Sequence, residues 1–176
     1  MDNLDFEAEL AVIIGKGGRA VRASQALEHI AGFACYNDGS VRDWQRHTTQ
    51  WTPGKNFPGT GAFGPWMTTP DESGDYKSKR IRTILNGEVM QDASLDDMIF
   101  SVGALIEYAS TFTPLSSGDV IVTGTPGGVG AMRNPPLFMK PGDIVSVAID
   151  GVGELSNRIV REARSPRRET EQRRRQ

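Results

Sequence analysis

Apolar and polar positions alternate and then merge near the start of the chain. Residues 7–15 begin as an alternation of glutamate with apolar residues and continue as an uninterrupted apolar run. This pattern is typical of a strand that passes from a polar rim into a core. Residues 19–30 then carry apolar side chains at helical spacing. The beginning of the chain therefore predicts a strand followed by a helix.

A group of short elements comes next. Residues 33–36 predict a short strand, and Ser40 is placed to cap a short helix over 41–45. Residues 46–70 are rich in glycine, proline and aromatic residues without a sustained period, which favours an irregular loop. We expect aromatic side chains to hold this loop against a sheet, since each fully buried one contributes roughly 2–3 kcal/mol. These side chains are Trp51, Phe57, Phe63 and Trp66.

The second half of the chain begins with a hairpin signal. Residues 81–91 contain the pair Asn86–Gly87, which tolerates the positive φ angles of a tight type I′ turn. Residues 94–112 carry an apolar stripe at helical spacing. Ser94 and Asp97 fit a capping box at its start. We therefore predict a hairpin followed by one long helix.

The remaining segments predict strands. Residues 119–123 predict a buried strand, and residues 144–149 and 152–160 predict two further strands around a turn. Strands outnumber helices and the hairpins imply antiparallel pairing, so the predicted class is α+β with a large sheet component. A chain of 176 residues fits one domain. We place that domain at 1–163 and a disordered basic tail at 164–176.

Composition excludes several classes of protein. The net charge of −2 and pI of about 5.7 give no general affinity for nucleic acid or an anionic membrane. Cys35 is the single cysteine, so the chain has no internal disulfide or cysteine cluster for zinc. The longest apolar run is far shorter than the roughly 20 residues of a membrane span, and the acidic start is unlike a signal peptide. We expect a cytoplasmic protein.

Three carboxylates are candidate metal ligands. Glu7 and Glu9 lie two residues apart on a predicted strand, so their side chains leave one face roughly 7 Å apart. If the fold brings Asp38 to the same place, the three would form an oxygen ligand set suited to magnesium, calcium or manganese. The residues alone leave a second interpretation open, in which the glutamates line a solvated edge.

Other polar residues could act beside such a metal. Arg42 and Gln45 share one face of the predicted short helix, where Arg42 could hold a substrate carboxylate bidentately. Lys55 could polarise a carbonyl or balance the acidic cluster. In the glycine-rich segment 124–130 the backbone N–H groups can approach an anion, with the hydroxyl of Thr125 as a further donor. Each of these residues could instead be an ordinary surface residue.

A competing motif occurs between the first predicted strand and helix. Gly15, Gly17 and Ala20 fit the pattern G-x-G-x-x-A, and Asp38 follows the next strand where a ribose-binding acid would lie. This favours a dinucleotide-binding oxidoreductase as a remote alternative. The glutamates in the first strand and the later hairpins are unlike the alternating strands and helices of that fold.

Five segments together resemble the fumarylacetoacetate hydrolase family in order and spacing. They are EAELAVIIG at 7–15, NDGSVRDWQ at 37–45, GKNF at 54–57, LNGEVMQ at 85–91 and VTGTPGGVG at 122–130. The resemblance runs from about residue 5 to residue 160. It implies a strand-rich mixed β-roll or sandwich with peripheral helices, usually as a homodimer.

The resemblance also implies functional residues. A divalent ion, Mg²⁺, Mn²⁺ or Ca²⁺, would be held by Glu7, Glu9 and Asp38. Catalysis and substrate binding would fall to Arg42, Gln45 and Lys55, with Thr125 as a further substrate-binding residue. The family segment that carries a catalytic histidine precedes the E-x-E strand, with which this chain begins. His29 and His47 do not match that histidine, so metal binding is better supported than hydrolysis.

Members of this family cleave carbon–carbon bonds in diketo acids, decarboxylate or tautomerise oxo acids, or hydrate related dienes, often in aromatic catabolism. We therefore expect a metal-dependent hydrolase that cleaves a carbon–carbon bond in a small acidic oxo compound of acylpyruvate or fumarylacetoacetate type. One alternative is an oxo-acid decarboxylase or tautomerase on the same scaffold. Another is a catalytically impaired domain that keeps its metal and ligand contacts.

Overall fold

Two four-stranded antiparallel sheets make up most of the molecule. The structure, a computed structural model, describes residues 3–162. One sheet has the strand order β5-β3-β2-β8, the other has the order β10-β9-β6-β7, and β1 pairs with β4 beside them. The strands are β1 (Leu4–Asp5), β2 (Ala8–Ile14), β3 (Ile30–Asp38), β4 (Ser40–Val41), β5 (Gly61–Thr68), β6 (Arg80–Leu85), β7 (Glu88–Ser94), β8 (Val120–Val122), β9 (Ile144–Ile149) and β10 (Gly153–Arg158).

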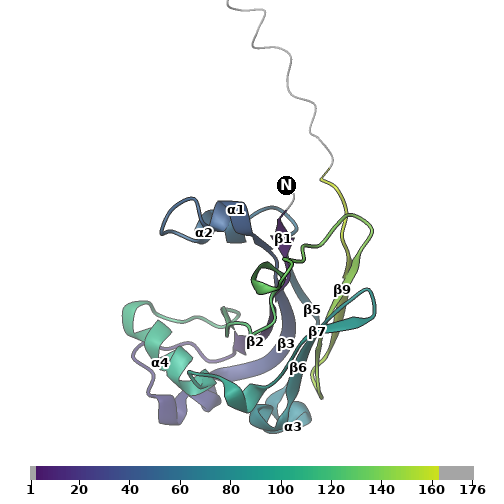
Figure 1. The fold of residues 1–176 in the computed structure, drawn as a ribbon. Helices are drawn as coiled ribbons and strands as arrows, with labels where there is room; N and C mark the ends of the chain where they lie inside the picture. Colours follow the sequence, from purple (N-terminus) through teal and green to yellow (C-terminus); the bar gives the residue numbers. More distant parts are fainter. Residues whose placement is uncertain (1–2, 163–176) are drawn as a thin grey trace, which may run out of the picture.

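The helices are short and lie around the sheets. Figure 1 shows α1 and α2 near one end of the curved β2–β3 pair and α4 near the other end. The α-helices are α1 (Arg42–Gln45), α2 (Thr52–Lys55), α3 (Pro70–Ser73) and α4 (Val102–Phe112). The 3-10 turns are η1 (Ala23–His29), η2 (Tyr76–Ser78), η3 (Leu95–Asp97) and η4 (Gly130–Met132). This arrangement confirms the predicted α+β class with its large sheet component.

The core lies between the two sheets. Leu10 and Val12 of β2 are fully buried in one cluster with Val147 and Ile149 of β9. Because successive strand residues face opposite sides of a sheet, Glu9 leaves the other face of β2. The alternation at the start of this strand therefore separates an apolar core from a polar face.

The predicted hairpin is confirmed by β6 and β7. Asn86 and Gly87 have φ angles of 52° and 87°, both positive, as a type I′ turn requires. The Asn86 side-chain amide donates to Asp143 at 2.9 Å, and its carbonyl oxygen accepts from the Ile144 N–H at 2.9 Å. The turn therefore also ties the hairpin to β9.

The helix predicted over 19–30 is present only in part and is not an α-helix. Only the shorter 3-10 turn η1 forms there, and Ala20 before it has a φ of 52°. A positive φ at a residue with a Cβ interrupts helical geometry. Gly18 forms an isolated antiparallel bridge with Leu115, so this part of the chain turns across the structure before η1 begins.

The helix predicted over 94–112 is divided in two. The Ser94 hydroxyl accepts from the Asp96 N–H at 3.2 Å and caps η3, so the predicted capping box with Asp97 is wrong. Ser101 caps α4, which begins only at the following residue. Local side-chain hydrogen bonds thus compete with a continuous helix despite the apolar stripe.

Two further predictions, one of a loop and one of a strand, also need correction. Residues 46–70 are not one irregular loop, because they contain α2 and the edge strand β5. Pro65 within β5 is compatible with an edge position, where a missing N–H can face away from the sheet. The strand predicted over 119–123 is present as β8, but it is an edge strand rather than a buried one. Val120 is 43% exposed and Val122 is 40% exposed.

Within residues 3–162, no helix is long and apolar enough to cross a membrane. One apolar cluster joins residues of both sheets in this part of the chain. The basic tail predicted at 164–176, and residue 163 at the predicted domain end, lie outside the described residues. The predicted domain boundary therefore stays a prediction.

Candidate metal centre

Glu7, Glu9 and Asp38 come together on the sheet face that points away from the core. Glu9 lies on β2, Glu7 directly precedes β2, and Asp38 ends β3. The two strands are antiparallel, and the Asp38 N–H donates to the Glu7 carbonyl oxygen at 2.9 Å. One carboxylate oxygen from each residue lies within 4.8 Å of the others. The structure thus provides the convergence that the sequence left open.

Two cationic side chains lie against this cluster. Lys55 Nζ is 2.8 Å from Glu7 Oε2 and 2.5 Å from Asp38 Oδ2. Arg42 Nη1 is 2.6 Å from Glu7 Oε1. Arg42 Nη2 also pairs with a further carboxylate, Asp5, at 2.7 Å. Carboxylates therefore outnumber cations here, and the remaining negative charge attracts a cation.

Burial changes the protonation of this site. Burial raises the pKa of the Glu9 carboxyl to about 7, although the hydrogen bond from the Gly124 N–H opposes the rise. The nearby carboxylates of Asp38 and Glu7 raise the pKa further, and Lys55 lowers it. Burial lowers the pKa of Lys55, but hydrogen bonds to Asp38 and Glu7 outweigh this and leave the pKa above its ordinary value. Lys55 is therefore protonated at neutral pH.

The donor set fits a divalent cation. Glu7, Glu9 and Asp38 all supply carboxylate oxygens, the ligands that magnesium, calcium and manganese prefer. Glu7 and Glu9 are buried, and their like charges repel unless a cation lies between them. The cluster contains no cysteine or histidine, the ligands typical of zinc.

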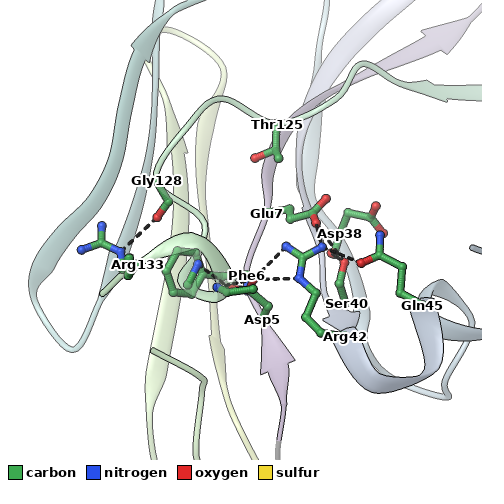
Figure 2. Close-up of polar contacts among 12 residues, drawn as sticks. Asp5, Phe6, Glu7, Asp38, Ser40, Arg42, Gln45, Thr125, Gly128 and Arg133 are labelled. Atoms are coloured by element: carbon green, nitrogen blue, oxygen red, sulfur yellow. Dashed lines mark hydrogen bonds and ion pairs between the residues drawn. The ribbon is translucent and has the colours of Figure 1, made fainter. Parts of the chain in front are cut away.

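The guanidinium of Arg42 is directed at the protein itself. Nε and Nη2 donate to Asp5 Oδ2 at 2.8 and 2.7 Å (Figure 2). Nη1 donates to Gln45 Oε1 at 2.8 Å and contacts Glu7. Arg42 and Gln45 do share one face of α1, as expected. We expected this guanidinium to bind a substrate carboxylate. Its Nε–Nη2 edge instead faces Asp5, because the buried Asp5 carboxylate needs a charged partner.

The short helix α2 brings Lys55 to the carboxylates. Gly54 lies so close to α1 that an added Cβ would be 2.5 Å from the Cβ of Gln45. Phe57 is partly buried and packs edge-on against Trp44, with ring centroids 5.3 Å apart. The predicted anchoring by the other aromatic residues is wrong, since the exposed side chains include Trp51, Phe63 and Trp66. Close helix packing, rather than aromatic burial, holds this segment.

The glycine-rich segment 124–130 lies beside the cluster. The Gly124 N–H donates to Glu9 Oε2 at 2.8 Å. The Thr125 hydroxyl accepts from the side-chain amide of Gln91 at 2.9 Å, which leaves its own proton to be donated elsewhere. We expected the N–H groups of this segment to approach an external anion. The first of them instead binds the protein's own carboxylate.

Three residues of this site were missed in the sequence: Asp5, Ser40 and Gln91. Asp5 could have been found, because the alternation D-F-E-A-E places it two residues before Glu7. Gln91 ends a segment that carries the family resemblance, but nothing local shows its partners. The Ser40 hydroxyl donates to the Asp38 carbonyl oxygen at 2.8 Å and to Glu7 at 3.2 Å. Its predicted role as a helix cap is therefore wrong.

The dinucleotide-binding interpretation is also wrong. That fold requires parallel strands joined by an α-helix, whereas β2 and β3 are antiparallel and joined through a 3-10 turn. The residues concerned are Gly15, Gly17 and Ala20. His29 hydrogen-bonds a backbone carbonyl and His47 packs on an aromatic ring. Within residues 3–162, neither histidine hydrogen-bonds or forms an ion pair with the three carboxylates.

Comparison with known families matches residues 1–160 to the family described as "Fumarylacetoacetate (FAA) hydrolase C-terminal". The chain belongs to the fumarylacetoacetate hydrolase family. Its fold is also similar to the solved fumarylacetoacetate hydrolase from psychrophilic Exiguobacterium antarcticum. That structure gives a TM-score of 0.87 at 39% sequence identity, over 91% of this chain and 57% of that chain. Both findings confirm the resemblance seen in the sequence.

Other fumarylacetoacetate hydrolase family proteins carry different names. One from Bos taurus, "Oxaloacetate tautomerase FAHD2A, mitochondrial", is 43% identical over 159 residues, which are 89% of this chain and 51% of the relative. Fumarylpyruvate hydrolase from Pseudomonas aeruginosa, solved with Mn²⁺ and pyruvate, is 36% identical with a TM-score of 0.82. The match covers 91% of this chain and 67% of that chain. The chain spans about half the length of the Bos taurus relative.

Proposed function

We propose that this chain carries a divalent-cation site that interconverts the keto and enol forms of a small oxo acid such as oxaloacetate. The observation that carries the proposal is the convergence of Glu7, Glu9 and Asp38 beside the protonated Lys55. The tautomerase name of a relative with 43% identity supports the reaction type. Carbon–carbon hydrolysis, the activity expected from the sequence, is the second candidate.

A divalent cation held by Glu7, Glu9 and Asp38 would polarise the oxygens of an oxo acid and stabilise negative charge that develops on them. Lys55 Nζ, which Glu7 and Asp38 hold in place, can donate a hydrogen bond to the reacting oxygen and hold a proton there. Thr125 offers a second donor from the opposite segment, since its oxygen already accepts from another residue.

Arg42 and Gln45 complete the proposed site. Gln45 Oε1 accepts from Arg42, so the Gln45 amide nitrogen can donate to a substrate carboxylate. Arg42 contacts Glu7 through its Nη1 atom, and its positive charge would lie near an anion held at the proposed cation. Lys55 is thus the proposed catalytic residue of the three, Gln45 contacts the substrate, and Arg42 acts mainly through Glu7.

Tautomerisation requires fewer reacting groups than hydrolysis, which is why we propose it first. Keto–enol interconversion moves one proton between the carbonyl oxygen and the carbon next to the carbonyl group, whereas hydrolysis also needs a group that activates water. Within the described part of the chain, neither His29 nor His47 hydrogen-bonds to the three carboxylates. Hydrolysis is favoured by the similarity to two solved hydrolases, fumarylacetoacetate hydrolase at 39% identity and fumarylpyruvate hydrolase at 36% identity. Acylpyruvates are therefore the second substrate class to test.

The test follows the decay of enol-oxaloacetate absorbance with the purified chain and Mn²⁺ or Mg²⁺. The wild type should accelerate the decay, and a chelator or Glu9→Gln should abolish the acceleration. Glu154→Gln, on an exposed position of β10, is the matched control and should behave as wild type. A rate that neither chelator nor Glu9→Gln changes would contradict the proposal.

Product analysis separates the candidate reactions. Oxaloacetate and a panel of acylpyruvates are incubated with the chain and followed by NMR. Keto–enol exchange alone supports a tautomerase, pyruvate with a second acid supports the hydrolase, and carbon dioxide supports a decarboxylase. Cation binding without any product would identify a catalytically impaired binding domain.

Four further expectations, on the metal, the oligomeric state, the location and the metabolic role, are proposals. The Mn²⁺ complex of the Pseudomonas aeruginosa relative supports manganese, with magnesium and calcium as the other ions to test. The family resemblance supports a homodimer, which sedimentation analysis of the purified chain would show. A cytoplasmic location and a role in aromatic catabolism remain predictions from the sequence, and the Bos taurus relative is named as mitochondrial.

A further inference from the structure

The carboxylate of Asp5 is 0% exposed and accepts hydrogen bonds from three separate segments of the chain. Oδ1 accepts from the backbone N–H groups of Phe6 and Gly130, both at 2.8 Å. Oδ2 accepts from the Ala131 N–H at 2.9 Å and from Nε and Nη2 of Arg42 at 2.8 and 2.7 Å. Figure 2 shows Asp5 and Arg42 facing each other in this arrangement.

Asp5 does not belong to the cation-binding group itself. The clustered oxygens come from Glu7, Glu9 and Asp38, whereas both oxygens of Asp5 are occupied by N–H donors. A buried carboxylate with this many donors, two of them from a guanidinium, is held in one orientation. Asp5 therefore has a task other than binding the cation.

We propose that Asp5 is a positioning residue that fixes Arg42 so that its Nη1 atom points at Glu7 and Gln45. A guanidinium is planar, so two nitrogens held by Asp5 set the direction of the third. That third nitrogen is 2.6 Å from Glu7 Oε1 and 2.8 Å from Gln45 Oε1. Asp5 thus orients Glu7 through Arg42. Its effect on cation affinity rests on the proposed function, in which Glu7 is a cation ligand.

The same carboxylate holds the far end of the glycine-rich segment. Gly124 at its start donates to Glu9, and Gly130 at its end donates to Asp5, both at 2.8 Å. A Cβ added at Gly130 would lie 2.6 Å from Asp5 Oδ1, so the approach requires glycine. Both ends of the segment 124–130 are therefore hydrogen-bonded to residues 5–9, the part of the chain that carries the glutamates.

A double-mutant cycle on Mn²⁺ affinity, measured by calorimetry on the full chain, tests this assignment. Asp5→Asn should weaken Mn²⁺ binding about tenfold, as for other residues that orient a metal ligand. In an Arg42→Met background the same change should have no further effect, since Asp5 acts through Arg42. Asp43→Asn removes an exposed carboxylate from α1 and should leave the affinity unchanged.

Two outcomes of the cycle would overturn the assignment. One is an unchanged Mn²⁺ affinity in folded Asp5→Asn. The other is an equal loss in both backgrounds, which would mean that Asp5 acts through its charge alone. If thermal melting shows that Asp5→Asn does not fold, Asp5→Glu replaces it. This variant keeps the charge but displaces the carboxylate, so it should also weaken binding.

A second readout needs no cation. In the wild type, the Nε–H proton of Arg42 should exchange slowly with water in NMR spectra, and Asp5→Asn should make its exchange fast. Fast exchange in the wild type would overturn the assignment of Asp5, whatever the Mn²⁺ affinity. If the wild type binds no Mn²⁺ but shows the protected Nε–H, the proposed function fails while the positioning of Arg42 by Asp5 stands.

Discussion

Gln91 and Thr125 are joined by a hydrogen bond of 2.9 Å from the side-chain amide of Gln91 to the Thr125 hydroxyl. The same nitrogen donates to the Pro126 carbonyl oxygen at 2.8 Å. The side-chain oxygen of Gln91 accepts from the Ala8 N–H at 3.0 Å and from the Thr83 hydroxyl at 2.6 Å. One buried side chain thus connects β2, the hairpin and the threonine of the glycine-rich segment.

Gln91→Leu should destabilise the protein strongly. Leucine has a similar size but leaves the Ala8 N–H and the Pro126 carbonyl without the partner that Gln91 supplies. An unsatisfied buried polar group costs about 1–3 kcal/mol, so the free energy of unfolding should fall by at least about 2 kcal/mol in urea denaturation. Gln50→Leu, at an exposed position, should change it by less than about 0.5 kcal/mol. Equal stabilities of the two variants would contradict the prediction.

Lys55→Met should separate cation binding from turnover. The ammonium lies against Glu7 and Asp38, so its removal leaves the carboxylates with more uncompensated negative charge. Mn²⁺ affinity measured by calorimetry should therefore stay the same or increase. Turnover of enol-oxaloacetate should fall by about 100-fold or more, the loss typical of a missing proton donor.

The matched control for this prediction is Lys77→Met. The Lys77 side chain is 52% exposed and lies 3.6 Å from Asp96, away from the cluster. Both variants should fold, as judged by thermal melting. A loss of both cation affinity and turnover in Lys55→Met would show that Lys55 holds the site together, and equal turnover in the two variants would remove it from the reaction.

Local patterns predicted the parts of this fold that depend on neighbouring residues. The alternation in 7–15 predicted β2, and the pair Asn86–Gly87 predicted the turn between β6 and β7. Backbone φ preferences and side-chain alternation act within a few residues, so the sequence displays them directly. The helix predicted over 94–112 failed for a related reason, because single capping hydrogen bonds such as that of Ser101 override a long apolar period.

Contacts between distant residues could not be predicted in the same way. Asp5 and Gly130 are 125 positions apart, and Ala8 and Gln91 are 83 positions apart. Nothing next to these residues indicates their partners, because the partners meet only when both sheets are assembled. The family resemblance implied that Glu7, Glu9 and Asp38 bind one cation. It did not show that Arg42 would be held by a further carboxylate.

Cys35 should resist thiol reagents in the folded protein. Burial raises the pKa of its thiol to about 11, and the side chain is 0% exposed. At pH 8 only about one thiol in a thousand would then be ionised, and the thiolate is the reactive form. Reaction with a disulfide reagent at pH 8 should be very slow without denaturant and fast in concentrated urea. Rapid reaction of the folded protein would contradict this burial.

The raised pKa of Cys35 also fixes the sign of its effect on stability. The thiol loses its proton more readily in the unfolded chain, whose ordinary pKa is about 8.5. Its contribution to the free energy of unfolding should therefore be constant below that pH and decrease from there towards pH 11. Cys35→Ala should lower stability near neutral pH but remove this decline, which urea denaturation at several alkaline pH values would measure.

Gly54→Ala should move Lys55 without removing any charged group from the site. The added Cβ would lie 2.5 Å from both the backbone nitrogen and the Cβ of Gln45, closer than atoms can pack. Helix α2 must therefore shift away from α1, at a cost of about 1–3 kcal/mol in the free energy of unfolding. Lys55 follows directly in the chain, so its ammonium should move away from Glu7.

A shift of about 1 Å in a reacting group can reduce turnover about 100-fold, so we expect a loss of this size in Gly54→Ala. Thr52→Ala, at an exposed position of the same helix, is the control and should keep both stability and turnover. Turnover is measured with enol-oxaloacetate below the melting temperature of both variants. Wild-type turnover in folded Gly54→Ala would mean that α2 accepts the methyl group without displacing Lys55, and glycine would then not be needed to place this residue.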